Sequence, residues 1–145
     1  MSSPIPAENR PSLLRRLLAI LYDGMLLLAL WMAASALWLA FTGGQAAAAG
    51  DALYRLYLLM VAYVFFAGFW CLAGRTLGMQ AWRLRVIDVN GQRIGVIAAT
   101  HRFMTAILSW LPLGGGFLWA MIDKDGLTWH DRLSKTYLYL DEKRG

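Results

Sequence analysis

The stretch from Leu17 to Phe41 contains a single charged residue, Asp23, and this feature constrains the fold more than any other. A helix of about 20 apolar residues is long enough to cross the roughly 30 Å hydrocarbon layer of a membrane. A second apolar run covers residues 53–73. Over the whole chain 59% of the residues are hydrophobic and 16% are charged, whereas about 25% are charged in a typical soluble domain. We therefore expect an all-α membrane protein whose first two spans are 17–41 and 53–73.

The third apolar region, 96–122, is interrupted by Pro112 and by the glycines 114–116. Proline removes a helical hydrogen bond and glycine is costly in a helix interior, so we expect a broken or kinked helix. Each half would hold about 13–15 residues, too few to cross a membrane alone. A single bent crossing and a re-entrant hairpin are both open, and the basic residues that follow favour the hairpin.

The segments outside the spans contain two strand-like patterns. Residues 82–89 become β-branched towards their end and are followed by Asn90-Gly91, which is typical of a tight hairpin turn. Residues 137–140 also read as a strand and would pair with 83–89 if both lay on the same side of the membrane. We therefore predict a small cytoplasmic β-hairpin or three-stranded element.

The domain organisation follows from these elements. A polar, proline-containing segment, 1–11, is expected to be a disordered tail, and Ser12 is expected to cap the first helix. We predict one membrane domain over 12–140, with a cytoplasmic loop at 74–95 and a short tail at 141–145.

Arginine and lysine positions predict the topology, because these residues are enriched in cytoplasmic loops. The N-terminal segment holds Arg10, Arg15 and Arg16, the linker 42–51 holds none, and the loop 74–95 holds four arginines. We expect a multi-pass protein of a bacterial inner membrane with its N-terminus in the cytoplasm. The net charge of +5 then indicates contact with anionic lipid headgroups.

Asp23 is the most informative single residue, because an unpaired aspartate inside a span costs about 2.5–3.5 kcal/mol. Such a residue is a functional candidate by default. The structural alternative is an ion pair with Arg75, Arg102 or another cation that fixes the helices in register. Both interpretations place Asp23 against protein.

Two further residues each allow two interpretations. Arg102, at the start of the third region, either extends to the headgroups or pairs with Asp23 or Asp131. His130, next to Asp131, is expected to order the C-terminal segment through helix capping or a charge pair. Two histidines without cysteine or glutamate at ligand spacing predict no metal site.

Other classes of function are not indicated. The charges lie in islands between apolar runs, which argues against a nucleic-acid-binding face. We expect no cofactor and no enzymatic activity, because no nucleophile–base pair, phosphate loop or metal cluster is visible. The alanines 29, 33, 36 and 40 allow close helix packing, either within the chain or in a homo-oligomer.

Three segments together resemble the RDD family of small membrane proteins, which is named for one arginine and two aspartates. They are Arg16 to Asp23, the loop from Gly74 to Gly91, and His130 to Thr136. The resemblance implies that Arg16, Asp23 and Asp131 are the residues that name the family. It implies a membrane location, and for some members a link to cation/proton antiport.

Two functions remain open. In the first, an oligomer transports a cation, a proton or a small solute and uses Asp23 as the titrating or ion-binding group. In the second, the protein is a non-transporting adaptor that binds an unknown protein partner through its cytoplasmic loop and tail.

Overall fold

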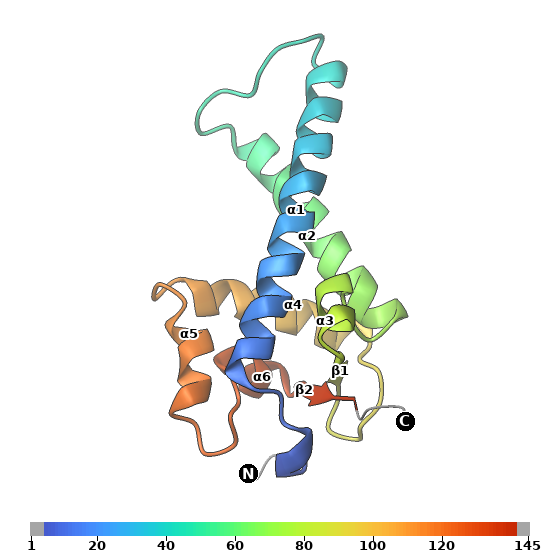
Figure 1. The fold of residues 1–145 in the computed structure, drawn as a ribbon. Helices are drawn as coiled ribbons and strands as arrows, with labels where there is room; N and C mark the ends of the chain where they lie inside the picture. The colour runs from blue at the N-terminus through green and yellow to red at the C-terminus, as the bar shows by residue number, and fades with distance from the viewer. Residues whose placement is uncertain (1–4, 142–145) are drawn as a thin grey trace.

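The computed structural model describes residues 5–141, and its most prominent feature is a pair of long antiparallel helices (Figure 1). Helix α1 spans Leu13–Phe41 and α2 spans Ala52–Leu72. The Ser12 side chain accepts from Arg15 N at 3.4 Å and so caps α1. Among residues 5–141 these two helices are each long and apolar enough to cross a membrane, so the two predicted spans are confirmed as long apolar helices.

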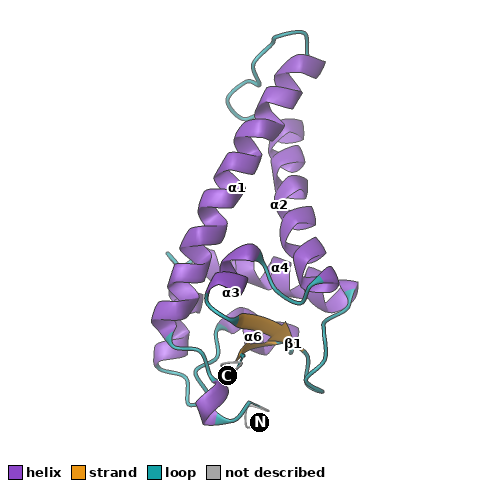
Figure 2. Ribbon diagram, turned by 45° about the vertical axis from the view of Figure 1, so that its right-hand side comes forward, coloured by secondary structure: helices purple, strands orange, loops and turns teal. Residues whose placement is uncertain are grey.

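The two helices pack most directly near the linker that joins them. The Trp38 ring lies 5.4 Å from Tyr54 and 5.5 Å from Tyr57, and Trp31 Nε1 donates to Leu58 O at 2.9 Å. Towards the other end the helices diverge, and α3 and α4 lie at that end (Figure 2). We call this the terminal end, because α1 begins there and α2 ends there.

The third apolar region is broken, as predicted. Helix α4 spans Val96–Trp110, and α5, Gly115–Leu118, continues into the 3-10 helix η2, Trp119–Met121. The two parts meet at an angle of 104°. Gly114 has a positive φ of 79° at the break, where most other residues would be strained.

The short elements gather at the terminal end. They are α3 (Leu77–Ala81), β1 (Leu84–Ile87), α6 (Trp129–Ser134) and β2 (Tyr137–Leu140). Strands β1 and β2 pair antiparallel, with Leu84 opposite Leu140 and Ile87 opposite Tyr137. The predicted pairing of these two segments is confirmed.

The expected hairpin at Asn90-Gly91 is a turn without a second strand. Asp88 accepts from the backbone of Asn90 and of Gln92, both at 2.8 Å, and Gly91 has a positive φ of 76°. The sheet described within residues 5–141 has two strands, β1 and β2. The reason is that Val86 N on β1 donates to Gly74 O at 2.8 Å, so a loop residue occupies the place of a third strand.

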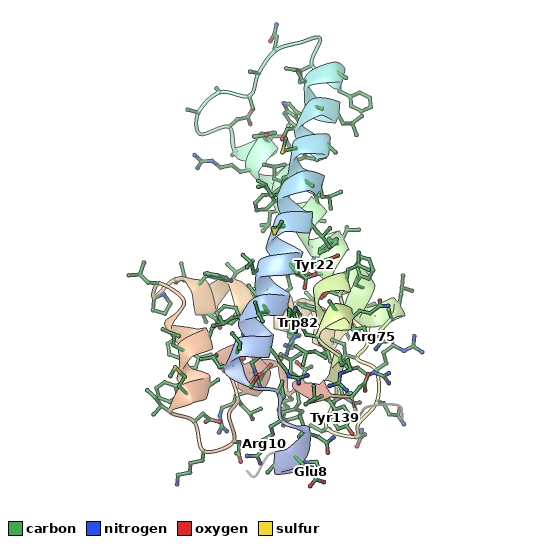
Figure 3. All side chains as sticks on the ribbon, in the orientation of Figure 1. Glu8, Arg10, Tyr22, Arg75, Trp82 and Tyr139 are labelled. Carbon is green, nitrogen blue, oxygen red and sulfur yellow. The ribbon has the colours of Figure 1, made fainter. Side chains whose placement is uncertain are left out.

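The N-terminal segment also differs from the expected disordered tail. Residues 7–9 form the 3-10 helix η1, Ala7–Asn9, and Ile5 and Asn9 are buried. Asn9 Nδ2 donates to Leu140 O at 3.3 Å, so this segment packs against the sheet. Residues 1–4 and 142–145 lie outside the described residues, and Figure 3 shows Glu8, Arg10, Arg75 and Tyr139 together at the terminal end.

Candidate functional site: a buried ion network and a membrane cavity

A network of two arginines and one aspartate lies inside the terminal end. Asp131 Oδ2 accepts from Arg16 Nη1 at 2.8 Å, and Asp131 Oδ1 accepts from Arg102 Nη1 at 2.7 Å. The side chains of Arg16, Arg102 and Asp131 are 5%, 1% and 0% exposed. Each carboxylate oxygen therefore holds one guanidinium, and α1, α4 and α6 are joined at a single residue.

Helix capping fixes the position of Asp131. Thr128 is the N-cap of α6, and its hydroxyl accepts from Asp131 N at 3.4 Å. In the reciprocal hydrogen bond, Asp131 Oδ2 accepts from Thr128 N at 3.2 Å. This reciprocal capping box satisfies two backbone donors, and it confirms the prediction that the His130-Asp131 segment orders the chain through capping.

Further polar and aromatic groups surround the two arginines. Arg102 Nη1 also donates to Thr136 Oγ1 at 2.7 Å, and Arg16 Nη2 donates to Gly126 O at 2.9 Å. The Arg102 guanidinium lies 5.4 Å from the centre of the Trp70 ring, within the range of a cation–π contact. Snorkelling of Arg102 to the headgroups is therefore wrong, and pairing with Asp131 is confirmed.

The charges in this network decide its protonation. Burial by itself raises the pKa of the Asp131 carboxyl, but the positive charges of Arg102 and Arg16 outweigh burial and hold that pKa well below its usual range. Burial lowers the pKa of His130 to about 3, although the charge of Asp131 acts in the opposite direction. At neutral pH the network thus holds an ionised aspartate beside a neutral histidine.

Asp23 occupies a separate position and is held by hydrogen bonds alone. Its Oδ1 accepts from Gly78 N at 2.8 Å, and its Oδ2 accepts from the Thr76 hydroxyl. Among residues 5–141 it forms no ion pair, so the expected pairing with Arg75 or Arg102 is wrong. Arg75 instead pairs with Asp141 at 3.2 Å.

Glycine at position 78 permits this arrangement. A Cβ there would lie 2.4 Å from Ala19 O and 2.8 Å from Asp23 Cγ. Both distances are far below van der Waals contact, so any side chain would force α3 away from α1. The Gly78 backbone therefore reaches the Asp23 carboxylate because no side chain intervenes.

A cavity of about 370 Å³ lies between α1, α2 and α4. Asp23, Arg16, Arg102 and His130 line its wall, and most of the remaining lining is apolar or aromatic. Its volume is within the range of about 300–1,000 Å³ that is typical of small-molecule sites. The cavity therefore connects Asp23 with the buried ion network, although the two do not touch through an ion pair.

The structure thus brings together four of the six predicted site residues, Arg16, Arg102, His130 and Asp131. Asp23 joins them only through the cavity, and Arg75 lies outside it. Sequence reasoning missed Thr76, Thr128, Thr136 and Trp70. The Thr128 N-cap was detectable, because a threonine three residues before Asp131 is a capping-box pattern. Among the described residues, no group of three or more His, Cys, Asp or Glu side chains is arranged to hold a metal ion.

These features define a class: a helical membrane protein in which a buried Arg–Asp–Arg network closes one end of a helix pair. The sequence model of the RDD family matches residues 10–135, and the chain belongs to the RDD family. The match includes Arg16, Asp23 and Asp131, the residues proposed to name the family. Neither the curated proteins nor the solved structures include a match to this chain.

Proposed function

We propose that this protein is an oligomeric transport component of a bacterial inner membrane, in which the cavity binds a small solute and Asp23 carries a proton. The N-terminus and the terminal end lie in the cytoplasm, in agreement with the arginine distribution. The observation that carries the proposal is the position of Asp23, a buried carboxylate on a cavity wall that two hydrogen bonds hold without a cation.

The environment of Asp23 suits a change of protonation. Ionisable groups inside a membrane are costly and are typical of proton relays. The Thr76 hydroxyl donates to the ionised carboxylate, and a hydroxyl can rotate to accept when the carboxyl is protonated. Thr76 therefore keeps Asp23 in place in both states, whereas a neighbouring arginine would have fixed the ionised state.

The lining of the cavity favours an anionic or neutral solute over a free cation. Two arginines, Arg16 and Arg102, line the wall, and Asp23 is the one carboxylate residue in the lining among the described residues. An alkali cation would need several oxygen ligands to replace its water shell. The proton is therefore the cation that we assign to Asp23.

A second copy of the chain supplies the part of the protein wall that one chain does not provide. The alanines 29, 33, 36 and 40 are all exposed on α1, so they do not pack within the chain. Small residues of this kind permit close approach of helices in a membrane. We propose that they contact a second copy of the chain.

Proton flux in proteoliposomes tests the proposal. Vesicles that contain a pH-sensitive dye are given gradients of Na⁺, K⁺ or octanesulfonate, a permanently charged anion. We expect flux with the wild-type protein and none above empty vesicles with Asp23→Asn. Asp125→Asn is the matched control, because its carboxylate pairs with Arg10 and Arg132 away from the cavity. Equal flux through Asp23→Asn and wild-type protein, both normally inserted, would overturn the proposal.

The adaptor function is the second candidate, and one observation favours it. The sheet packs against α6 and η1 beyond the helix pair. Arg85 on β1 and Lys135 at the end of α6 are exposed there, and Arg93 is exposed in the loop that follows β1. A protein partner with an acidic surface would fit there. Crosslinking with intact cells should then recover a partner that is lost on Arg85→Glu and retained on Arg15→Glu.

A further inference from the structure

Three arginines lie around the end of α2. Arg75 follows α2, Arg85 lies on β1, and Arg93 lies in the loop before α4. A Cβ at Gly74 would lie 3.2 Å from Arg93 Cγ and 3.7 Å from Arg85 Cγ, so the stems of both side chains lie against the Gly74 backbone. The three side chains therefore belong to one surface of the terminal end, which we call the arginine surface.

A single oxygen already bridges two of these arginines. Asp141 Oδ2 accepts from Arg75 Nη1 at 3.2 Å and from Arg85 Nη2 at 3.3 Å. The side chains of Arg75, Arg85 and Asp141 are 32%, 46% and 26% exposed, so this ion pair lies at the surface of the protein. The position of Asp141 Oδ2 is thus one at which a single anionic oxygen serves two guanidinium groups.

The arginine surface keeps positive charge after this pairing. Among residues 5–141, Asp141 is the one carboxylate that forms an ion pair with any of its three arginines. Arg93 is exposed, and its Nη1 donates to Leu72 O, which carries no charge. Partly exposed ion pairs contribute little to stability, so another anion can take the place of Asp141. Phosphate suits this position, because guanidinium groups match its geometry.

Exposed apolar side chains adjoin the arginine surface. Leu72 is the last residue of α2 and is exposed, and its backbone oxygen accepts from Arg93. Val96 and Ile97, in the first turn of α4, are exposed as well. An anion that binds here therefore meets apolar surface beside the positive charges, which suits a lipid better than a free phosphate.

The arginine surface also lies at the level expected for lipid headgroups. Figure 3 shows Arg75 between Tyr22, within the apolar run of α1, and Tyr139 on β2. Arginine near the end of a membrane span reaches the headgroups while its stem covers apolar surface. Each basic residue near an anionic leaflet strengthens the attraction to it.

We propose that the arginine surface binds an anionic phospholipid of the leaflet that faces the terminal end. A phosphate oxygen takes the position of Asp141 Oδ2 between Arg75 and Arg85. Arg93 adds a third positive charge, and an acyl chain lies along the exposed start of α4. Asp141 competes with the lipid for this position. The binding is independent of the transport function, because none of these residues lines the cavity.

Native mass spectrometry of the full chain in a neutral detergent measures the binding. Dioleoyl phosphatidylglycerol and dioleoyl phosphatidylcholine are the probes, because they share their chains and their phosphate and only the first has a net charge. We expect phosphatidylglycerol to bind in preference to phosphatidylcholine. Equal binding of the two lipids, or binding of neither, would overturn the proposal and leave an acidic protein as the partner of these arginines.

Variants of the arginine surface locate the site. Arg75→Gln and Arg85→Gln should each weaken phosphatidylglycerol binding about fivefold, the contribution of one basic residue near an anionic surface. Arg55→Gln is the matched control, because Arg55 is exposed at the opposite end of α2, and it should leave the binding unchanged. Equal effects of the three substitutions would show a response to total charge alone and would overturn the site.

Asp141→Asn gives the sharpest test, because the expected effect is a gain. Removal of the competing charge should strengthen phosphatidylglycerol binding severalfold, and a poorly folded variant cannot imitate a gain. Asp125→Asn removes the same charge from a carboxylate that pairs with Arg10 and Arg132, and it should leave the binding unchanged. An Asp141→Asn protein that binds no more tightly than Asp125→Asn would overturn the placement of the phosphate.

Inorganic phosphate distinguishes the two sources of the bound group. It has the charge of the headgroup without an acyl chain, so we expect it not to displace phosphatidylglycerol at equal concentration. Displacement under these conditions would show that the arginine surface takes a free phosphate, and it would overturn the assignment to a lipid.

Discussion

The two buried aspartates of this protein are held in opposite ways. Asp131 is ionised by two arginines, one on each oxygen, whereas Asp23 receives a hydroxyl and a backbone N–H. The first arrangement fixes a charge, because removal of either partner would leave an unpaired ion in a dry interior. The second leaves the charge free to change. We therefore propose that Asp131 stabilises the fold and that Asp23 is the residue available for function.

The largest expected effect comes from the ion network. Asp131→Asn leaves Arg16 and Arg102 buried without a counter-charge, so we expect a loss of about 3–5 kcal/mol in the free energy of unfolding. Unfolding of the purified protein by a denaturing detergent measures the loss. Asp125→Asn, whose partners Arg10 and Arg132 are both partly exposed, should cost at most about 1 kcal/mol. Equal losses in the two variants would contradict the assigned role of Asp131.

The second-largest effect is expected from a substitution that removes one hydrogen bond to the Asp23 carboxyl but keeps the carboxyl itself. Thr76→Val removes the hydroxyl that donates to Asp23 and that also caps α3 by accepting from Met79 N at 3.2 Å. We expect a loss of about 2–3 kcal/mol in the same unfolding measurement. Thr76→Ser keeps both bonds and should lie near wild type. A Thr76→Val protein as stable as Thr76→Ser would show that this hydroxyl does not stabilise the Asp23 site.

A smaller effect tests the close approach of α3 to α1. Gly78→Ala places a methyl group against Ala19 O, and overpacking of this kind costs about 1–3 kcal/mol. Gly68→Ala in α2 is the matched control, since a Cβ there meets nothing within 4 Å. We expect the control to be neutral or slightly stabilised. A stable Gly78→Ala protein with unchanged proton flux would show that the Gly78 contact does not position Asp23.

The smallest effect, per unit of pH, concerns the neutral histidine beside Asp131. The folded protein keeps His130 neutral down to pH about 3, whereas the unfolded chain binds a proton below about pH 6.5. Between these values acidification favours the unfolded state, so stability falls by up to about 1.4 kcal/mol per pH unit.

Melting temperatures between pH 7 and 5 measure this dependence. The window ends about one pH unit above the pKa of Asp131 in the unfolded chain, about 3.9, so that this carboxyl contributes little to the slope. His130→Asn should flatten the profile, and His101→Asn, on an exposed residue, should leave it unchanged. An unchanged slope in His130→Asn would assign the pH dependence to another group.

Much of the architecture could be predicted from local sequence. The spans follow from apolar runs of sufficient length, and the break at Pro112–Gly116 follows from residues that cannot continue a helix. The pairing of β1 with β2 could also be predicted, on the condition that both strand-like segments lie on the same side of the membrane, whereas its antiparallel direction comes from the structure. The prediction of a hairpin at Asn90-Gly91 was wrong, because Gly74 O accepts from Val86 N at the edge of β1 where a further strand would pair. A local turn pattern gives no information about a residue so far away in the sequence.

The candidate site was predictable only as a set of residues. Asp23 and Arg102 were identified because charges in or near apolar runs need a reason. The family resemblance implied Arg16 and Asp131, and His130 was noted as the neighbour of Asp131. Their pairing was not identified, because Arg102 and Asp131 are 29 residues apart and Arg16 and Asp131 are 115 apart. No periodicity relates such positions. The same holds for residues 5–11, whose polar composition gave no sign that Asn9 would bond to Leu140.

The sequence by itself therefore determined that this chain enters a membrane, where its helices begin and break, and which family it belongs to. These properties depend on hydrophobicity, chain stiffness and motif residues, all of which are local. The tertiary structure alone decided that Asp131 receives both Arg16 and Arg102 and that Asp23, among residues 5–141, receives the Thr76 hydroxyl and the Gly78 N–H instead of an arginine. The physical reason is that charge pairing and burial depend on distances in space, which exist only once α1, α2, α4 and α6 have packed together.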